Sequence, residues 1–156
     1  MSFVERLVEI AKGEIGVTEE PGNTGLPFER YAIQGEEPLA WCARFVRYCV
    51  EKAGGSLPGH RYKLAQVAFL EGQFIKKKWF HKTDPQVGDI VFYKTRKGSD
   101  AGFGRHVGIV VGVVNDRLLT TVEGNFGDKV TRRTQAKPWA NVTGFGRLPD
   151  DGGAVN

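Results

Sequence analysis

The sequence predicts an α+β fold in which N-terminal helices pack on an antiparallel β-sheet. In the first half of the chain, apolar residues recur at the three- and four-residue spacing of helices. From residue 87 onward they form short, valine-rich runs separated by turn residues. Helices followed by a block of adjacent strands are typical of this class. At 156 residues the chain fits one domain, which we expect to span 3–148, with a frayed tail over 149–156.

The first predicted helix covers 3–15, where one face collects the apolar side chains Val4, Leu7, Val8, Ala11 and Ile15. Ser2 is a suitable N-cap with Glu5 as its capping-box partner, and Gly16 is a natural stop. A polar segment follows over 16–37. A loop of this length is either functional or a surface crossover, and the sequence leaves both open.

Two further helices are expected before the strands begin. The second covers 39–53, with Pro38 in a position tolerated at a first turn and Gly54 as the stop. The third, over 61–70, is shorter.

Strands are predicted over 87–93, 105–114, 117–123, 129–133 and 142–146. Between the second and third of these lies Asn115-Asp116, a turn signal flanked by apolar runs. We therefore expect the two neighbouring strands to form a hairpin.

Composition narrows the class of protein. The 22 lysines and arginines exceed the 18 acidic residues, which gives a net charge of +4. Such an excess suits a solvated surface or an anionic partner. The basic clusters 76–78 and 132–133 lack any groove-reading motif, so nucleic acid is not an expected partner. No run approaches the length of a membrane span. The charged first helix does not resemble a signal peptide, so we expect synthesis in the cytoplasm without an export signal.

The two cysteines are expected to be free thiols. Cys42 and Cys49 are seven residues apart in a predicted helix, which places their Cα atoms roughly 10 Å apart. A disulfide tolerates no more than about 7 Å, and the spacing is not that of a zinc site either. Cys49 lies in the helix interior and is expected to be a core residue.

Cys42 lies near the N-terminus of its helix, where unpaired backbone N–H groups and the helix dipole favour a thiolate. The same N–H groups can bind a developing oxyanion. A free cysteine is also a common small core residue, so on its own the position allows either a nucleophile or a buried apolar side chain.

His106 begins an apolar strand, and Glu123 and Asn125 lie near the end of the next one. If residues equidistant from the hairpin turn pair, all three side chains reach the same end of the hairpin, and alternation puts 123 and 125 on one face. Either residue can then orient the imidazole of His106. The alternatives are a structural histidine and a surface acid at the end of a strand.

Four other residues have weaker chemical signals. Trp41, beside the cysteine, is either a core residue or a wall of a substrate-binding site. Asp89 follows a proline-containing turn and is expected to be a turn residue rather than a catalytic acid. His60 and His81 lie in polar contexts typical of the surface.

Four motifs together resemble the CHAP domain, the cysteine, histidine-dependent amidohydrolase/peptidase branch of the NlpC/P60 superfamily. They are Trp41-Cys42-Ala43, Pro85 to Tyr93 (PQVGDIVFY), His106-Val107-Gly108-Ile109-Val110 and Val122-Glu123-Gly124-Asn125. Each is weak alone, but their order is specific, and the resemblance covers roughly residues 5–147.

The resemblance implies a papain-like α+β fold and cleavage of peptidoglycan, within the stem peptide or at its amide link to the sugar. It implies Cys42 as nucleophile, His106 as base, Glu123 as the residue that orients the imidazole, and Asn125 as a supporting polar group. Some relatives bind calcium through an aspartate-rich loop. The corresponding loop here has no aspartate, so we expect neither a metal nor a cofactor.

The predicted protein is a monomeric thiol hydrolase that acts at the bacterial cell wall, reached with a release or delivery partner. Phage lysins, wall-remodelling enzymes and antibacterial effectors share this pattern. Two alternatives remain: an acyltransferase that uses the same cysteine and histidine, and a basic module that binds wall polymer without cutting it.

Overall fold

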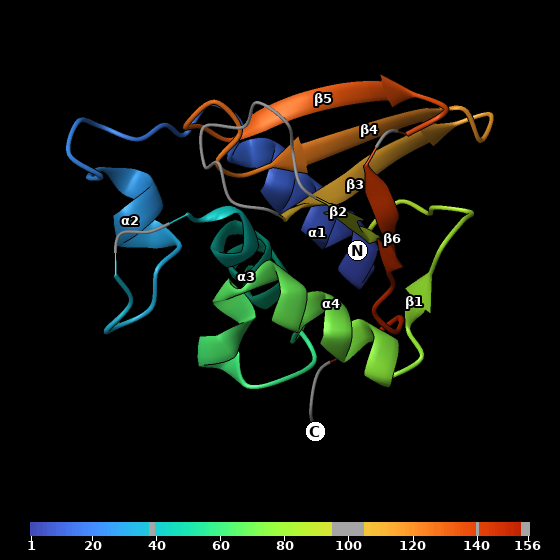
Figure 1. Ribbon diagram of the computed structural model, residues 1–156, viewed down its shortest axis with the longest axis horizontal. Helices are drawn as coiled ribbons and strands as arrows, with labels where there is room; N and C mark the ends of the chain where they lie inside the picture. Colours follow the sequence, from blue (N-terminus) through green and yellow to red (C-terminus); the bar gives the residue numbers. More distant parts are fainter. Residues whose placement is uncertain (38–39, 95–104, 140, 154–156) are drawn as a thin grey trace.

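The computed structural model describes residues 1–37, 40–94, 105–139 and 141–153. Its centre is an antiparallel sheet in the order β1-β6-β2-β3-β4-β5, and Figure 1 shows helices α3 and α4 below this sheet. The predicted α+β class, with helices packed on an antiparallel sheet, is confirmed. No helix in these ranges is long and apolar enough to cross a membrane.

The strands are β1 (Phe80–His81), β2 (Ile90–Tyr93), β3 (His106–Val114), β4 (Leu118–Glu123), β5 (Thr131–Ala136) and β6 (Val142–Gly146). All five predicted strands are present. The strand expected from residue 87 begins at Ile90 because Val87 and Gly88, the latter with a φ of 94°, form a turn. The two-residue β1 was not predicted, since two residues are too few to show alternation.

Helix α1 (Phe3–Gly13) begins as predicted. The Ser2 hydroxyl accepts from the backbone N–H of Glu5, and the Glu5 carboxylate accepts from the backbone N–H of Ser2. The helix ends before residue 15, at the C-cap Glu14. Phe3, Leu7 and Ala11 form its buried face.

The next predicted helices have different bounds. Helix α3 (Cys42–Lys52) begins at the cysteine rather than at residue 39, and the predicted first-turn Pro38 lies outside the described residues. The third predicted helix is two elements, a 3-10 helix (Arg61–Ala65) and α4 (Val67–Lys76). Gln66 separates them because its backbone is extended, with φ −100° and ψ 119°.

The β3–β4 hairpin sets the register of the strands that carry His106 and Glu123. Its turn is Asn115-Asp116, as predicted, and both residues have positive φ, 50° and 54°, which is the requirement of a tight hairpin turn. An irregularity between Val110 and Gly112 shifts the pairing, so that Ile109 lies opposite Val122.

The sheet has apolar side chains on both faces. The helix-facing side carries Val107, Ile109 and Val122, which belong to the main core with α1 and α3. The other side carries a smaller cluster, Val91, Tyr93, Val110, Leu119 and Phe145. Alternate residues of a strand face opposite sides of the sheet. Polar residues that alternate with the helix-facing ones therefore lie on the same face as the smaller cluster.

The polar segment 16–37 contains a short helix, α2 (Leu26–Arg30), which was not predicted. The segment is joined to the sheet side of the molecule where the Val130 backbone N–H donates to the Val17 carbonyl at 2.8 Å. At the other end of the chain, Gly152 is buried and its carbonyl accepts from Ser56 at 2.9 Å. The tail that we expected to be frayed therefore makes contacts up to this point.

Candidate active site

Cys42 is the first residue of α3, and Trp41 is the N-cap. The indole of Trp41 makes no capping hydrogen bond to the first turn, so the N–H groups there remain available to an anion. Cys42 is 6% exposed, whereas Cys49, further along the same helix, is fully buried at 0%. Both are free thiols, and only the first has a surface that a substrate can reach.

His106 is the first residue of β3, at the end of the sheet. Its Nε2 lies 2.7 Å from Oε1 of Glu123. Its imidazole also interacts with the side chain of Cys42, which raises the pKa of His106. Since Nε2 is engaged by the carboxylate, Nδ1 is the nitrogen that remains for the sulfur. The structure therefore brings together the three residues that the sequence predicted: Cys42, His106 and Glu123.

Glu123 ends β4 and is completely buried. Besides the imidazole, its oxygens accept from the Tyr93 hydroxyl at 2.8 Å and the Thr121 hydroxyl at 2.7 Å. Arg133 donates from two nitrogens, Nε to Oε1 at 3.1 Å and a terminal nitrogen to Oε2 at 3.0 Å. A buried carboxylate is tolerated when it is paired and fully hydrogen-bonded, and this one is held in a single orientation toward His106.

Arg133 belongs to the basic cluster 132–133, for which the sequence left open a solvated surface or an anionic partner. The guanidinium covers two rings, 4.4 Å from the centroid of Phe126 and 5.3 Å from that of Tyr93. This stacking fixes the plane of the guanidinium against the carboxylate of Glu123.

The close approach of β3 and β4 depends on Gly108. A Cβ atom at this position would lie 2.5 Å from Cγ of Glu123. Only a residue without a side chain leaves the glutamate room to reach the imidazole.

The charges of His106 and Glu123 stabilise one another. Burial lowers the pKa of His106, but its hydrogen bonds with Cys42 and Glu123 and their charges outweigh burial and raise the pKa to about 9. Burial raises the pKa of Glu123, but His106, Arg133 and Thr121 outweigh it and lower the pKa to about 2. At neutral pH the site therefore holds an imidazolium between a carboxylate and a sulfur.

The other two predicted site residues make no hydrogen bond with the imidazole in the part of the chain that the structure describes. Trp41 is completely buried, its indole N–H donates to Glu19 at 2.6 Å, and its ring stacks on Tyr31. Trp41 thus packs in the main core directly beside Cys42. Asn125 lies beyond the end of β4 with a φ of 55°. The residue that contacts the imidazole is Glu123.

The segment before the cysteine is fixed by ion pairs. Arg47, buried in α3, donates to both carboxylate oxygens of Glu36, and Arg44 donates to the Glu37 carbonyl. Together with the Glu19–Trp41 hydrogen bond, these contacts give the polar segment 16–37 a structural role beside the site.

The remaining candidates behave as non-catalytic residues. Asp89 is buried, caps the Gln86 backbone N–H at 2.8 Å and forms an ion pair with Arg147, as expected of a turn residue. His60 and His81 are exposed. Within the described residues, no three acids, histidines or cysteines cluster as metal ligands.

Comparison with known proteins identifies the family. The model of the CHAP domain matches residues 34–125, a stretch that includes Cys42, His106 and Glu123 and ends before Arg133. The chain belongs to the CHAP domain family, a family of peptidoglycan-related amidases and peptidases. The resemblance seen in the sequence is thus confirmed.

A solved structure with the same fold is a Staphylococcus aureus protein described as similar to lipoprotein, NLP/P60 family. The two align with a TM-score of 0.51 and 15% identity over 93% of this chain and 41% of that chain. This chain therefore spans less than half the length of that protein, and the likeness supports the papain-like α+β fold. A search of curated proteins gave no match.

Proposed function

We propose that this chain hydrolyses amide bonds of peptidoglycan through a Cys42 thiolate, with His106 as the proton carrier and Glu123 as the residue that orients it. The observation that carries the proposal is the position of the imidazole, held by Glu123 at 2.7 Å on one nitrogen and close enough to Cys42 for that side chain to raise the pKa of His106. A nucleophile, a base and an orienting acid in this order are the parts of a thiol hydrolase.

The charge state of the site defines the first step. With the pKa of His106 raised to about 9, the imidazole is protonated at neutral pH and favours a thiolate beside it. The sulfur attacks the amide carbonyl carbon, and the carbonyl π electrons move to oxygen. The N–H groups at the start of α3 donate hydrogen bonds to the resulting oxyanion.

The imidazolium then acts as an acid. The C–N bond breaks as the oxyanion electrons re-form the carbonyl, and His106 gives its proton to the leaving amine. This step leaves an acyl-thioester on Cys42 and a neutral imidazole. A water molecule attacks the thioester while His106 takes its proton, and the departing sulfur leaves as thiolate beside a renewed imidazolium.

The family supports the substrate class, since CHAP domains are peptidoglycan-related. Both a stem-peptide endopeptidase and an N-acetylmuramoyl-L-alanine amidase cut an amide bond by this chemistry. The proposed site of action is accordingly the bacterial cell wall.

Purified peptidoglycan provides the test. Released amines and loss of turbidity are measured for wild type, Cys42→Ala and the matched control Cys49→Ala, which removes the core thiol of the same helix. We expect Cys42→Ala to lose several orders of magnitude in rate, and Cys49→Ala to retain activity. Equal activity of wild type and Cys42→Ala would reject the proposal.

A further inference from the structure

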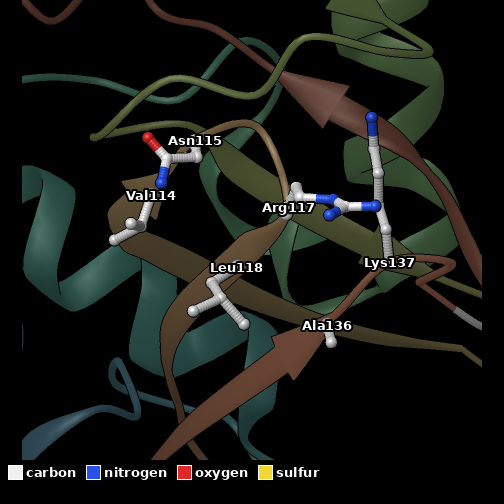
Figure 2. Close-up of a pocket in the computed structure, with 6 residues that line it drawn as sticks. All are labelled: Val114, Asn115, Arg117, Leu118, Ala136 and Lys137. Carbon is white, nitrogen blue, oxygen red and sulfur yellow. The ribbon is translucent and has the colours of Figure 1, made fainter.

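One polar side chain of β5, that of Gln135, lies on the face of the sheet that carries the candidate active site. The next residue, Ala136, lines a hollow of about 330 Å³ together with its β4 partner Leu118 (Figure 2). Because the side chains of a strand alternate between the two faces, Gln135 and its own β4 partner Leu119 lie on the other face. Leu119 belongs to the apolar cluster that also contains Tyr93, so this face leads from Gln135 toward the site.

The amide of Gln135 is connected to Glu123 through the hydroxyl of Tyr93. Nε2 of Gln135 donates to the Tyr93 oxygen at 2.7 Å, and that hydroxyl donates to Oε2 of Glu123 at 2.8 Å. Oε1 of the same carboxylate lies 2.7 Å from Nε2 of His106. Tyr93 is 2% exposed and Glu123 is completely buried, so bulk water does not compete for these bonds. Side chains from β5, β2, β4 and β3 thus form one hydrogen-bonded chain.

The charge of Glu123 determines the direction of this chain. A hydroxyl has one proton to donate and lone pairs that accept. Burial and the charge of Glu123 raise the pKa of Tyr93 above its ordinary value of 10.0, so the hydroxyl keeps its proton at neutral pH. An ionised carboxylate accepts more strongly than a neutral amide carbonyl, and it therefore takes this proton. The Tyr93 oxygen is left as an acceptor, which requires Gln135 to present its NH₂ group rather than its carbonyl.

The hydroxyl of Tyr93 in turn helps to hold the carboxylate of Glu123. Oε2 accepts from Tyr93 on β2 at 2.8 Å, from Thr121 on β4 at 2.7 Å and from Arg133 on β5 at 3.0 Å. Bonds that come from three strands leave the carboxylate little freedom to rotate, so Oε1 stays directed at the imidazole. Loss of the tyrosine bond would release one side of this support.

We propose that Gln135 and Tyr93 are positioning residues of the site, an assignment that rests on the hydrolase function proposed above. The amide directs the tyrosine proton to Glu123, and the carboxylate held in this way keeps the imidazole of His106 in place beside Cys42. Gln135 therefore acts on the reaction only through Tyr93.

NMR titration of the His106 imidazole tests this chain without any substrate. Tyr93→Phe keeps the ring and removes only the hydroxyl. Glu123 then loses a donor and interacts more strongly with the imidazole, whose pKa should rise above about 9. Gln135→Met should raise this pKa by a smaller amount, because the tyrosine hydroxyl becomes a weaker donor. The control Thr134→Val, which removes a hydroxyl from the opposite face of β5, should leave the imidazole pKa unchanged.

The double variant Tyr93→Phe/Gln135→Met separates a positioning role from a merely structural one. Since the amide acts through the hydroxyl, adding Gln135→Met to Tyr93→Phe should change neither the imidazole pKa nor kcat any further. A further change as large as the one that Gln135→Met causes in wild type would overturn the proposal.

Gln135→Glu tests the direction of the chain. The new carboxylate can only accept, so it competes with Glu123 for the proton of Tyr93. We expect kcat on a soluble muropeptide to fall about tenfold, with KM within about twofold of wild type because the substrate contacts are intact. In the Tyr93→Phe background the same substitution should change kcat by less than about twofold, since no proton remains to compete for. A Gln135→Glu variant with the kcat of wild type would overturn the assigned direction.

The positioning roles and the proposed function can fail separately. If wild type does not cut peptidoglycan but the imidazole pKa shifts as described, the function fails and the positioning roles stand. If wild type cuts peptidoglycan but Tyr93→Phe leaves both the imidazole pKa and kcat unchanged, the function stands and the positioning roles are overturned.

Discussion

Replacing Glu123 by glutamine tests the electrostatics of the site most fully, because the change keeps the volume and removes the charge. The carboxylate is completely buried and accepts from His106, Tyr93, Thr121 and Arg133 at 2.7 to 3.1 Å. The new amide nitrogen is a donor that faces donors, and two cations lose their counter-charge. Breaking a buried ion pair in this way costs on the order of 3–5 kcal/mol of folding free energy.

The size of this loss depends on pH in a defined way. The pKa of Glu123 is lowered to about 2, so its stabilisation is complete above its ordinary pKa of 4.5 and is lost as pH falls through about 2. The pKa of His106 is raised to about 9 from 6.5, so its stabilisation is complete below pH 6.5 and is lost as pH rises through about 9. The variant should therefore differ most from wild type between about pH 4.5 and 6.5.

Two measurements check this prediction: denaturant unfolding as a function of pH, and NMR titration of the His106 imidazole. In Glu123→Gln the imidazole pKa should fall clearly below about 9, since an attractive charge and an acceptor are removed. An unchanged imidazole pKa, or an unfolding free energy equal to that of wild type across this range, would refute the reasoning.

Three further predictions concern the same site. Arg133→Met should raise the imidazole pKa, in contrast to Glu123→Gln, because the carboxylate then acts on His106 alone. It should also lower the free energy of unfolding by about 3 kcal/mol. NMR titration measures the first effect and denaturant unfolding the second, and a lowered imidazole pKa would contradict the ion-pair geometry. Gly108→Ala places a Cβ 2.5 Å from Glu123 Cγ and should lower the free energy of unfolding by about 1–3 kcal/mol and remove most activity. In the control Gly112→Ala the new Cβ lies 3.5 Å from Thr120 Cβ, so both losses should be small. Similar losses in the two variants would contradict the close approach of Gly108 to Glu123. In wild type, kcat/KM on a soluble muropeptide should fall as pH rises through about 9, because the imidazolium loses its proton there. Glu123 stays ionised down to about pH 2. Activity that persists well above pH 9 would contradict the role of the imidazolium as an acid.

Much of the fold could be predicted because its signals are local. The Ser2–Glu5 capping box and the Asn115-Asp116 turn each act within a few residues. The boundaries were harder to predict, since the extended Gln66 breaks a helical pattern for reasons that lie in tertiary packing. The two-residue β1 exists only through its pairing with β6.

The central residues of the site could also be predicted, because hairpin geometry relates His106 to Glu123 without any long-range information. The pairing of side chains across the four strands β2, β3, β4 and β5 could not be predicted. Tyr93 lies opposite His106 and Arg133 lies opposite Thr121, and this follows from the strand order rather than from any motif. Thr121 and Glu123 are two residues apart on one strand, a spacing that places both side chains on the same face of the sheet. The alternation within the strand of Arg133 assigns its side chain to one face in the same way. No motif in the sequence relates Arg133 to the buried Glu123 with which it forms an ion pair.

Alkylation of Cys42 by iodoacetamide is the most direct test that its sulfur and the imidazole of His106 form one unit. Its rate is followed by peptide mass analysis from pH 5 to 10 in wild type and in His106→Ala, with Cys49 as the internal control. We expect rapid reaction of Cys42 at neutral pH, a marked slowing in His106→Ala, and no reaction of the buried Cys49 in the folded protein. Reaction of Cys42 at the rate of an ordinary thiol, or at the same rate with and without the imidazole, would contradict the proposed active site.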